Sequence, residues 1–392
     1  MIALSAWGAT LAGVAVGAAC GFTVRRARLC SFGAVEDAWM GGDTRRLRVF
    51  GLALAIALIG TQTLIGLSLL DPANSTYVQP ALPWLSIVVG STLFGLGMAL
   101  VGTCGFGSLV RLGSGDLRSL IVMMVFGAVA YATLRGMFAP IRIEVLEKVY
   151  WPLPGGLKGD LAGILTYLGA PSARALLTAV GALVLITIVA VDPRLRRSPR
   201  LLLAGATLGL AVVAGWWVTG VAVDAFETVP RAQSLTFVSP VGRALYAVLS
   251  APSALLEFGI GTLVGVTLGS FLSALYDREF RWEAFDDDRE MRRHLLGAVL
   301  MGGGGVLAGG CTIGQGISAG SMLALSWPLA IAGMMIGARI GIAILMEGSI
   351  KGALATRLRS HTAPTGLRTP QRSGRPYPAV RPARWHRAGG SR

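Results

Sequence analysis

The sequence predicts an all-α polytopic membrane protein with about nine transmembrane helices, re-entrant half-helices and an inverted, pseudo-symmetric repeat. Three observations favour this fold class. The 392 residues are 53% hydrophobic and only 14% charged, whereas soluble domains carry about a quarter charged residues. Apolar runs long enough to cross a bilayer as helices recur along the chain. The 54 glycines suit membrane helices that pack closely together.

Nine apolar runs of membrane-spanning length follow one another along the chain. They are predicted at about 4–22, 48–70, 84–103, 118–137, 173–191, 200–221, 254–275, 295–310 and 326–346. Residues 1–19 lack a basic n-region, so we expect them to form the first span and not a cleavable signal peptide.

Arginine clusters predict the orientation of these spans. Clusters lie at 25–28 and 45–48, between the first two spans, and at 194–200, between the fifth and sixth. Basic residues also follow the ninth span. Because basic loops stay on the cytoplasmic side, we expect the N-terminus outside and the C-terminus in the cytoplasm.

Composition divides the chain into a transmembrane domain, residues 1–350, and a basic tail, residues 351–392. The tail is rich in Pro, Gly and Arg and has no Asp or Glu, so we expect it to be disordered. A tail that binds nucleic acid is compatible with this charge. An extension against anionic membrane lipid is favoured, and no nucleic-acid partner is expected.

Three short strings share a cysteine followed, three residues later, by a glycine: Cys30-Ser31-Phe32-Gly33, Cys104-Gly105-Phe106-Gly107 and Cys311-Thr312-Ile313-Gly314. They lie in stretches at 29–41, 104–115 and 311–322 that are apolar and Gly-rich but too short to cross the membrane again. Backbone at membrane depth must be buried in protein or line a wet cavity unless it is helical across the bilayer. We therefore expect re-entrant half-helices there.

An internal repeat relates two of these strings. Residues 100–107 and 307–314 match at the leucine, one glycine, the cysteine and the last glycine, and each string precedes a span with a late arginine, Arg135 or Arg339. The predicted repeats are about 1–137 and 200–350, with a linker span within about 138–191. One linker crossing makes the halves inverted, as in many transporters that bind substrate near the midplane.

The chemistry of the strings favours an anion site. A half-helix that begins just after a cysteine directs free N–H groups and the positive dipole end at its ligand. Glycine allows close approach of the ligand to the backbone, and a thiol suits sulfur better than hard oxygen. The predicted substrate-binding residues are Cys30, Cys104, Cys311, Gly105, Phe106, Gly107, Thr312, Ile313 and Gly314.

Other interpretations of these residues are weaker. Free cysteine often behaves as a small buried hydrophobe, and we favour that interpretation for Cys20 in the first span. The chain has no Cys-x-x-Cys pair, no phosphate-binding loop and only three dispersed histidines. We therefore predict no metal site, no cofactor and no catalytic residues, and a protein that is not an enzyme.

At these strings the sequence resembles the YeeE/YedE family of membrane sulfur-transport proteins, which includes bacterial thiosulfate transporters. Residues 28–34 (RLCSFGA), 102–108 (GTCGFGS) and 309–315 (GGCTIGQ) carry the resemblance, and with their neighbouring spans they cover most of residues 1–350. The resemblance implies a helical bundle in the bacterial inner membrane, constricted at cysteine-tipped short helices. It also implies a relay of thiosulfate by S–H···S contacts without cleavage, and small cytoplasmic sulfurtransferases as partners.

One departure from the family concerns the second repeat. The inverted repeat predicts a counterpart of Cys30 within about 230–240, where family members can carry a cysteine. This chain has Ser234, Thr236 and Ser239 there. Either a hydroxyl replaces the thiol or the ligand differs from thiosulfate.

The leading hypothesis is uptake of thiosulfate or a related small sulfur-containing anion across the cytoplasmic membrane. Cys104 and Cys311 would form the central relay, and Cys30 a site toward the cytoplasm. One alternative is a channel for another small anion that uses helix ends and arginines. The other is a membrane sulfurtransferase that carries persulfide on a cysteine.

Overall fold

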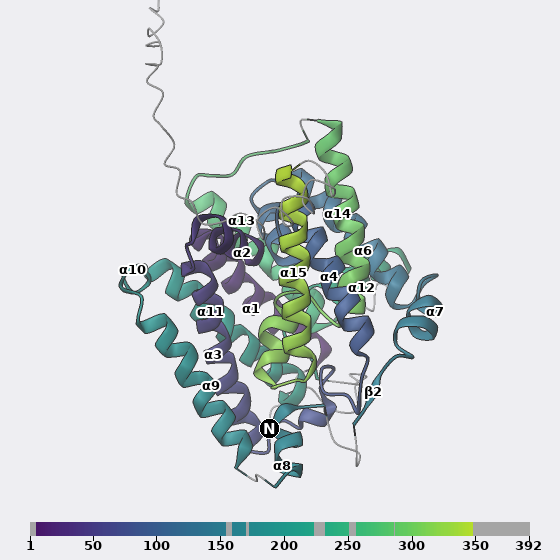
Figure 1. Cartoon of the computed structure of the whole chain (residues 1–392). Helices are drawn as coiled ribbons and strands as arrows, with labels where there is room; N and C mark the ends of the chain where they lie inside the picture. Colours follow the sequence, from purple (N-terminus) through teal and green to yellow (C-terminus); the bar gives the residue numbers. More distant parts are fainter. Residues whose placement is uncertain are drawn as a thin grey trace, which may run out of the picture.

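The computed structural model describes residues 5–153, 159–169, 172–222, 232–250, 256–285 and 287–347. Within these ranges the chain is mostly helical (Figure 1). Two short strands, β1 (Ala81–Leu82) and β2 (Trp151–Pro152), form one antiparallel pair in which Ala81 faces Pro152. The predicted all-α fold class is confirmed. The predicted basic tail, 351–392, lies outside the described residues.

Eight helices in the described part of the chain are long and apolar enough to cross a membrane. They coincide with eight of the nine predicted spans, so the chain is a multi-pass membrane protein. These helices are α1 (Ala6–Ala27), α3 (Arg45–Gly66), α4 (Trp84–Val101), α6 (Leu117–Leu134), α9 (Ala173–Ala190), α11 (Pro199–Trp217), α13 (Phe258–Tyr276) and α15 (Ser326–Glu347).

The ninth predicted span, 295–310, lies in a helix that is more polar than the others. This helix, α14 (Asp288–Leu307), begins before the predicted start, and its first turns carry Asp288, Glu290 and several arginines. Glu290 pairs with Arg118 at 3.3 Å, before the apolar second half of α14 packs against α4 and α6. The apolar part alone is therefore shorter than a full span.

Shorter helical segments connect the long helices. The stretches predicted as half-helices form α2 (Ser31–Glu36) with the π-helical η1 (Asp37–Gly41), α5 (Gly105–Gly113) and the π-helical η7 (Gly314–Ala319). The remaining segments are α7 (Ala139–Ile141), α8 (Leu161–Tyr167), α10 (Pro193–Arg196), α12 (Val238–Ser250), the 3-10 helix η2 (Pro72–Asn74), and the π-helical η3 (Arg142–Leu146) and η5 (Val218–Ala222).

The long helices of one half of the chain pack against those of the other half, in pairs that correspond. α1 packs against α13, and α11 packs against α3; α15 packs against α4, and α6 against α14. In addition, α1 contacts α11, and α4 contacts α14. α5 lies against α13 as η7 lies against α3. Each half therefore contributes helices to the other half's packing.

Glycines set the distance between the paired helices α1 and α13. A Cβ atom on Gly13, Gly17 or Gly21 would lie 2.2–2.5 Å from a carbonyl oxygen of α13. Because no side chain fits there, the two backbones meet directly, as in other membrane helix pairs with small residues at their interface. The same backbone contact recurs where α13 presents its own glycines to α1.

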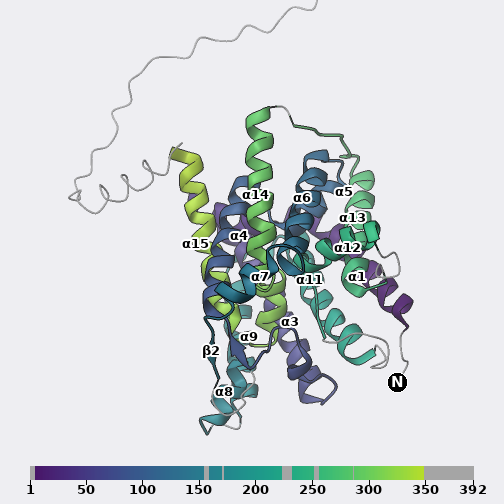
Figure 2. The ribbon, with the colours of Figure 1, turned by 90° about the vertical axis from the view of Figure 1, so that its right-hand side faces the viewer.

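The two ends of the described chain lie at opposite ends of the molecule. Figures 1 and 2 show α1 starting in the lower half of the molecule, the half that contains α8, and α15 finishing near the top. α2, the start of α14 and the end of α13 also lie near the top. A chain that crosses the membrane an odd number of times, with α14 counted as one crossing, has its two ends on opposite sides.

Candidate functional site

Cys104 caps a short helix with its thiol. α4 is followed by Gly102, whose φ of +75° places it in the left-handed region, and α5 begins at Gly105. The backbone N–H of Gly107 donates to Cys104 Sγ at 3.4 Å, so the thiol satisfies one of the free donors at the start of α5. Cys104 is buried.

The Cys311 turn repeats this geometry. Gly309 has a φ of +74°, and the N–H of Gly314 donates to Cys311 Sγ at 3.4 Å. Cys311 is fully buried. The matched strings at 100–107 and 307–314 therefore form the same local structure, a left-handed glycine followed by a thiol that accepts from the third residue on. Here the helical turn that follows is the π-helical η7.

The structure brings Cys30 to Cys104. Cys30 is the residue before α2, and its Sγ lies 3.4 Å from Thr103 Oγ1. Cys30 Sγ also lies beside Gly107 of the Cys104 turn, 3.4 Å from the position of a Cβ on that glycine. Two cysteines that are 74 residues apart in the chain thus share one cluster.

Two contacts join this cluster to the Cys311 turn. Ser31 Oγ and Thr312 Oγ1 are 3.0 Å apart and share a hydrogen bond. The rings of Phe106 and Phe237 pack with their centroids 4.8 Å apart, and Thr236, next to Phe237 in the chain, lies beside Gly314 of the Cys311 turn. The Cys104 and Cys311 turns therefore belong to one buried layer.

The three hydroxyl residues considered as counterparts of Cys30 have different surroundings. Ser234 Oγ donates to the carbonyl of Val212 at 2.7 Å and is buried. Ser239 lines a cavity described below. Thr236 lies beside Gly314, because a Cβ there would be 2.8 Å from Thr236 Oγ1.

Thr236 thus sits beside Gly314 much as Cys30 sits beside Gly107. A Cβ on Gly107 would lie 3.4 Å from Cys30 Sγ and 2.2 Å from Thr103 Oγ1. At Gly314 the second neighbour is the Tyr77 hydroxyl, at 2.9 Å. Sequence reasoning missed Tyr77, because a lone tyrosine in the connection at 71–83 has no motif that marks it.

The remaining predicted residues support the two turns. Gly105 lies under the ring of Phe126, with which a Cβ would be in ordinary contact at 3.5 Å. Ile313 is fully buried.

Cys20, predicted to be a small buried hydrophobe, is buried in α1, with its Sγ 3.9 Å from the Thr207 carbonyl oxygen. Among the described residues, no group of three or more His, Cys, Asp or Glu side chains could hold a metal ion.

Cavities approach the buried layer from both ends of the molecule. The Cys30 cavity, about 430 Å³, is lined by Cys30, Thr103, Gly107 and Arg111 among others. The Tyr77 cavity, about 500 Å³, is lined by Tyr77, Ser239, Arg142 and Gln315 among others. Cys104 and Cys311 line neither cavity, so the two thiols lie in the layer that separates them.

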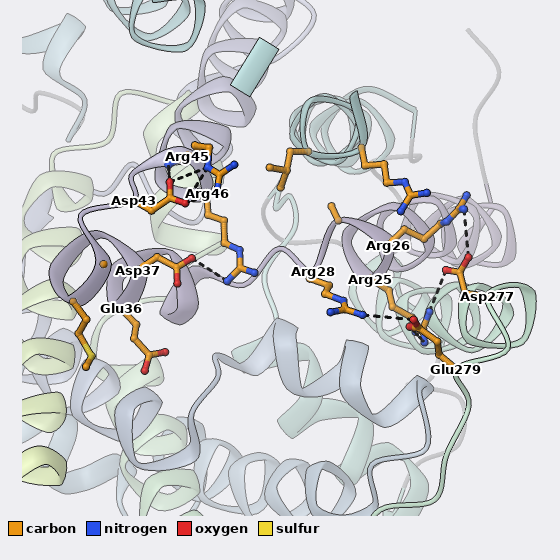
Figure 3. Close-up of a pocket in the computed structure, with 15 residues that line it drawn as sticks. Arg25, Arg26, Arg28, Glu36, Asp37, Asp43, Arg45, Arg46, Asp277 and Glu279 are labelled. Carbon is orange, nitrogen blue, oxygen red and sulfur yellow. Dashed lines mark hydrogen bonds and ion pairs between the residues drawn. The ribbon is translucent and has the colours of Figure 1, made fainter. Parts of the chain in front are cut away.

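A third cavity, of about 840 Å³, adjoins the Cys30 cavity and is named here the arginine cavity (Figure 3). The two share Arg25, Arg28, Glu36, Arg46 and Glu279 as lining residues. Figure 3 shows its charges arranged in ion pairs, which are Arg25–Asp277, Arg25–Glu279, Arg26–Asp277, Arg28–Glu279, Arg46–Asp37 and Arg45–Asp43.

Most arginines near these cavities are neutralised by carboxylates. The Arg45 guanidinium, which hydrogen-bonds Asp43, lowers the pKa of that carboxyl to about 2, so Asp43 stays ionised at neutral pH. Arg111 differs, because its described hydrogen bond is to the carbonyl of Gly102, at 3.1 Å. Within the described part of the chain no carboxylate forms an ion pair with Arg111, and its charge remains available in the Cys30 cavity.

A family model described as sulphur transport matches residues 26–340. The chain belongs to this family. The match confirms the resemblance found at the cysteine strings, and it includes all three of them.

Similar proteins in the family are named as transporters. The chain is 29% identical to "Thiosulfate transporter TsuA" of Escherichia coli strain K12 over 353 residues, which cover 83% of this chain and 92% of that protein. It is 28% identical to the protein of the same name from Spirochaeta thermophila, over 83% of this chain and 96% of that one. "Probable transporter YedE" of Escherichia coli is 28% identical over 38% of the chain and 35% of that protein. These names agree with the prediction of a transport protein and not an enzyme.

Proposed function

We propose that the protein takes up thiosulfate, or a related small sulfur-containing anion, across the bacterial cytoplasmic membrane through a cysteine-lined path. Two relatives that align over most of this chain are named thiosulfate transporters. The observation that carries the proposal is the pair of thiol-capped turns at Cys104 and Cys311, held in one buried layer between two cavities.

The path begins in the Tyr77 cavity and ends in the Cys30 cavity. An anion that enters beside Tyr77 and Thr236 meets the Cys311 turn first, then the Cys104 turn, and leaves past Cys30. The N–H groups at the start of α5 favour negative charge, and the thiols contact sulfur by S–H···S hydrogen bonds. Several weak sites in series let the anion bind and still leave.

Glycine is needed on this path beside both thiols. Gly107 and Gly314 let side-chain hydroxyls pack directly against the capped turns, at positions where a Cβ would be too close to an oxygen. With no side chain on either residue, the turn backbone is open to an anion that displaces these hydroxyls. We place Gly105, Phe106, Thr312 and Ile313 with them as the residues that shape the two turns.

The corresponding helix contacts support an inverted repeat. Exchange of the two halves, about 1–137 and 200–350, maps the α1–α13 contact onto α11–α3 and the α4–α15 contact onto α14–α6. The left-handed glycines and the thiol caps of the two turns correspond as well. We place α2, α5 and η7 at membrane depth as re-entrant segments, where two halves of opposite orientation meet.

The arginine cavity is proposed to face the cytoplasm, with the N-terminus outside. It lies at the end of the molecule where α2 and the end of α13 lie (Figure 1), and basic residues remain inside. A small cytoplasmic sulfurtransferase would receive the anion at this face. The tail, 351–392, would lie against anionic lipid on the same side.

Uptake of radiolabelled thiosulfate into proteoliposomes tests the function. We expect Cys104→Ala and Cys311→Ala to abolish uptake while the protein stays folded and inserted. Cys20→Ala is the matched control, since Cys20 is equally buried but lies between α1 and α11, away from the relay. Full uptake by both relay variants would rule out the proposed path.

Two further measurements separate the alternatives. Excess sulfate should compete poorly with thiosulfate, because a thiol relay favours soft sulfur; equal competition by sulfate and halide would indicate a general anion channel instead. Intact mass after incubation with thiosulfate should be unchanged. A gain of one sulfur atom on a cysteine would indicate a sulfurtransferase that carries persulfide.

A further inference from the structure

An apolar cavity of about 250 Å³ opens beside the cysteine layer and belongs to neither end of the path. It is named here the side cavity. Apolar residues of α2, α3, α4, η7 and α15 line it, among them Val35, Phe50, Ile331 and Met335. The polar lining residues Ser31 and Thr312 are the pair whose hydroxyls join the two cysteine turns.

The side cavity exists because the two halves differ at this point. In the second half, the 13-residue helix α12 packs along α6, where Tyr246 stacks on Tyr131 with ring centroids 4.7 Å apart. The corresponding position in the first half holds α2, a 6-residue helix continued by the π-helical η1. α2 contacts α15 over a short length, and the groove along α15 that it leaves open is the side cavity.

The lining, which is mostly apolar, favours hydrocarbon over water as the occupant. Apolar cavities of about 150 Å³ bind hydrocarbon, and this cavity has more room. Because α3, α4 and α15 are membrane-spanning helices, the hydrocarbon available to the cavity is that of the bilayer. Half-buried Ile331 and Met335, with exposed Leu47, form its margin on α15 and α3.

The cation Arg339 lies on the same face of α15 as the residues that border the side cavity. Ile331, Met335 and Arg339 follow one another at intervals of four residues on α15, so they share one face of the helix. Arg339 lies about 6 Å beyond Met335 along the helix axis, toward the arginine side. Its guanidinium stacks over the ring of Trp39 at 5.5 Å, it is exposed, and no ion pair joins it to a carboxylate in the described residues.

We propose that the side cavity is a binding site for an anionic phospholipid, with an acyl chain among the apolar residues and the phosphate at Arg339. The Trp39 ring, beside the guanidinium, sits where the head group meets the acyl chains, a position typical of tryptophan in membrane proteins. The bound chain reaches Ser31 and Thr312 and so packs against the contact that holds the two cysteine turns together.

Photolabelling of the full-length protein tests this site directly. The probe is phosphatidylglycerol with a photoreactive acyl chain, added to the protein in nanodiscs, with labelled peptides identified by mass spectrometry. We expect label in 47–54 or 331–335, displaced by unlabelled phosphatidylglycerol and several-fold less well by phosphatidylcholine. Equal displacement by the two lipids, or label on other faces only, would overturn the proposal.

Two variants and two controls locate the head group and the chain. Arg339→Gln should reduce labelling about five-fold, the effect of one arginine at an anionic lipid surface, and Val35→Phe should reduce it by filling the cavity. Arg135→Gln, at an exposed arginine directly after α6, and Val180→Phe, at an exposed valine on α9, should leave it unchanged. Unreduced labelling of Arg339→Gln would refute the head-group contact, and the wild-type competition decides the case even if Val35→Phe fails to fold.

Discussion

Ser31 Oγ and Thr312 Oγ1 lie 3.0 Å apart, although their residues belong to opposite halves of the chain. Ser31 is the first residue of α2, next to Cys30, and Thr312 directly follows Cys311. This hydrogen bond is therefore the shortest described polar link between the Cys30–Cys104 cluster and the Cys311 turn. It joins the two turns directly, and the proposed relay requires them to stay at this separation.

The hydrogen bond between Ser31 and Thr312 should be detectable as an energetic coupling between substitutions at the two residues. We expect Ser31→Ala and Thr312→Val each to lower thermal stability and thiosulfate uptake, and the double variant to lose less than the sum, with a coupling of about 1 kcal/mol. Thermal unfolding and uptake of all four proteins measure it. Thr23→Val, which removes a local bond within α1, is the control and should couple with neither. Strictly additive losses would show that the contact contributes nothing.

Substitution of the path glycines should block uptake. Gly107→Ala places a Cβ 2.2 Å from Thr103 Oγ1, and Gly314→Ala places one 2.8 Å from Thr236 Oγ1. Such overpacking costs about 1–3 kcal/mol and pushes aside the hydroxyls that pack beside each thiol. Gly303→Ala is the control, because its Cβ would meet neighbours only at 3.7 Å or more. Uptake at the wild-type rate by both path variants would be incompatible with an anion passing there.

Local sequence was sufficient to predict the long helices and a short helical segment after Cys104 and after Cys311, but not that each thiol caps its own turn. Hydropathy decides where a chain enters the bilayer, and the start of α5 immediately after Cys104 follows from the glycines on either side of that cysteine. The start of α14 could not be predicted from hydropathy, because ion pairs such as Glu290–Arg118 stabilise its charged first turns.

The partners of the two turns depend on packing between distant segments. Thr236 and Tyr77 meet at Gly314 from opposite sides of the chain's midpoint, and no local pattern links them. Similarly, Arg111 and Arg118 both follow Cys104 in the chain, and the sequence does not distinguish them. Only the structure shows that Arg118 is held by Asp116, Glu283 and Glu290, while Arg111 faces the Cys30 cavity.

A buried ion pair should anchor the linker span to the Cys311 half. Asp160, which is 2% exposed, pairs with Arg174 of α9, and Arg174 also donates to Gln62, whose amide donates to the Ser321 carbonyl at 2.8 Å. Asp160→Asn should destabilise the protein by about 3 kcal/mol, since it leaves Arg174 without its carboxylate. Thermal unfolding in detergent measures this.

The matched control for Asp160 is an exposed ion pair. Glu144 pairs with Lys148 on the surface, with both side chains at least 60% exposed. Glu144→Gln should change stability by less than about 0.5 kcal/mol. If the two variants shift the unfolding temperature equally, the Asp160 pair is not a structural anchor.

The unpaired charge of Arg111 should draw the anion into the Cys30 cavity. Because exposed charges act over about 10 Å at 0.1 M salt and less at higher salt, Arg111→Gln should raise the KM for thiosulfate most strongly at low ionic strength. Arg28→Gln is the matched control: Arg28 lines the same cavity but pairs with Glu279 at 3.5 Å and is 77% exposed. Uptake by inside-out vesicles, in which the arginine side faces the medium, gives the KM as salt is varied. A KM of Arg111→Gln that stays at the wild-type value at every salt concentration would show that Arg111 attracts no substrate.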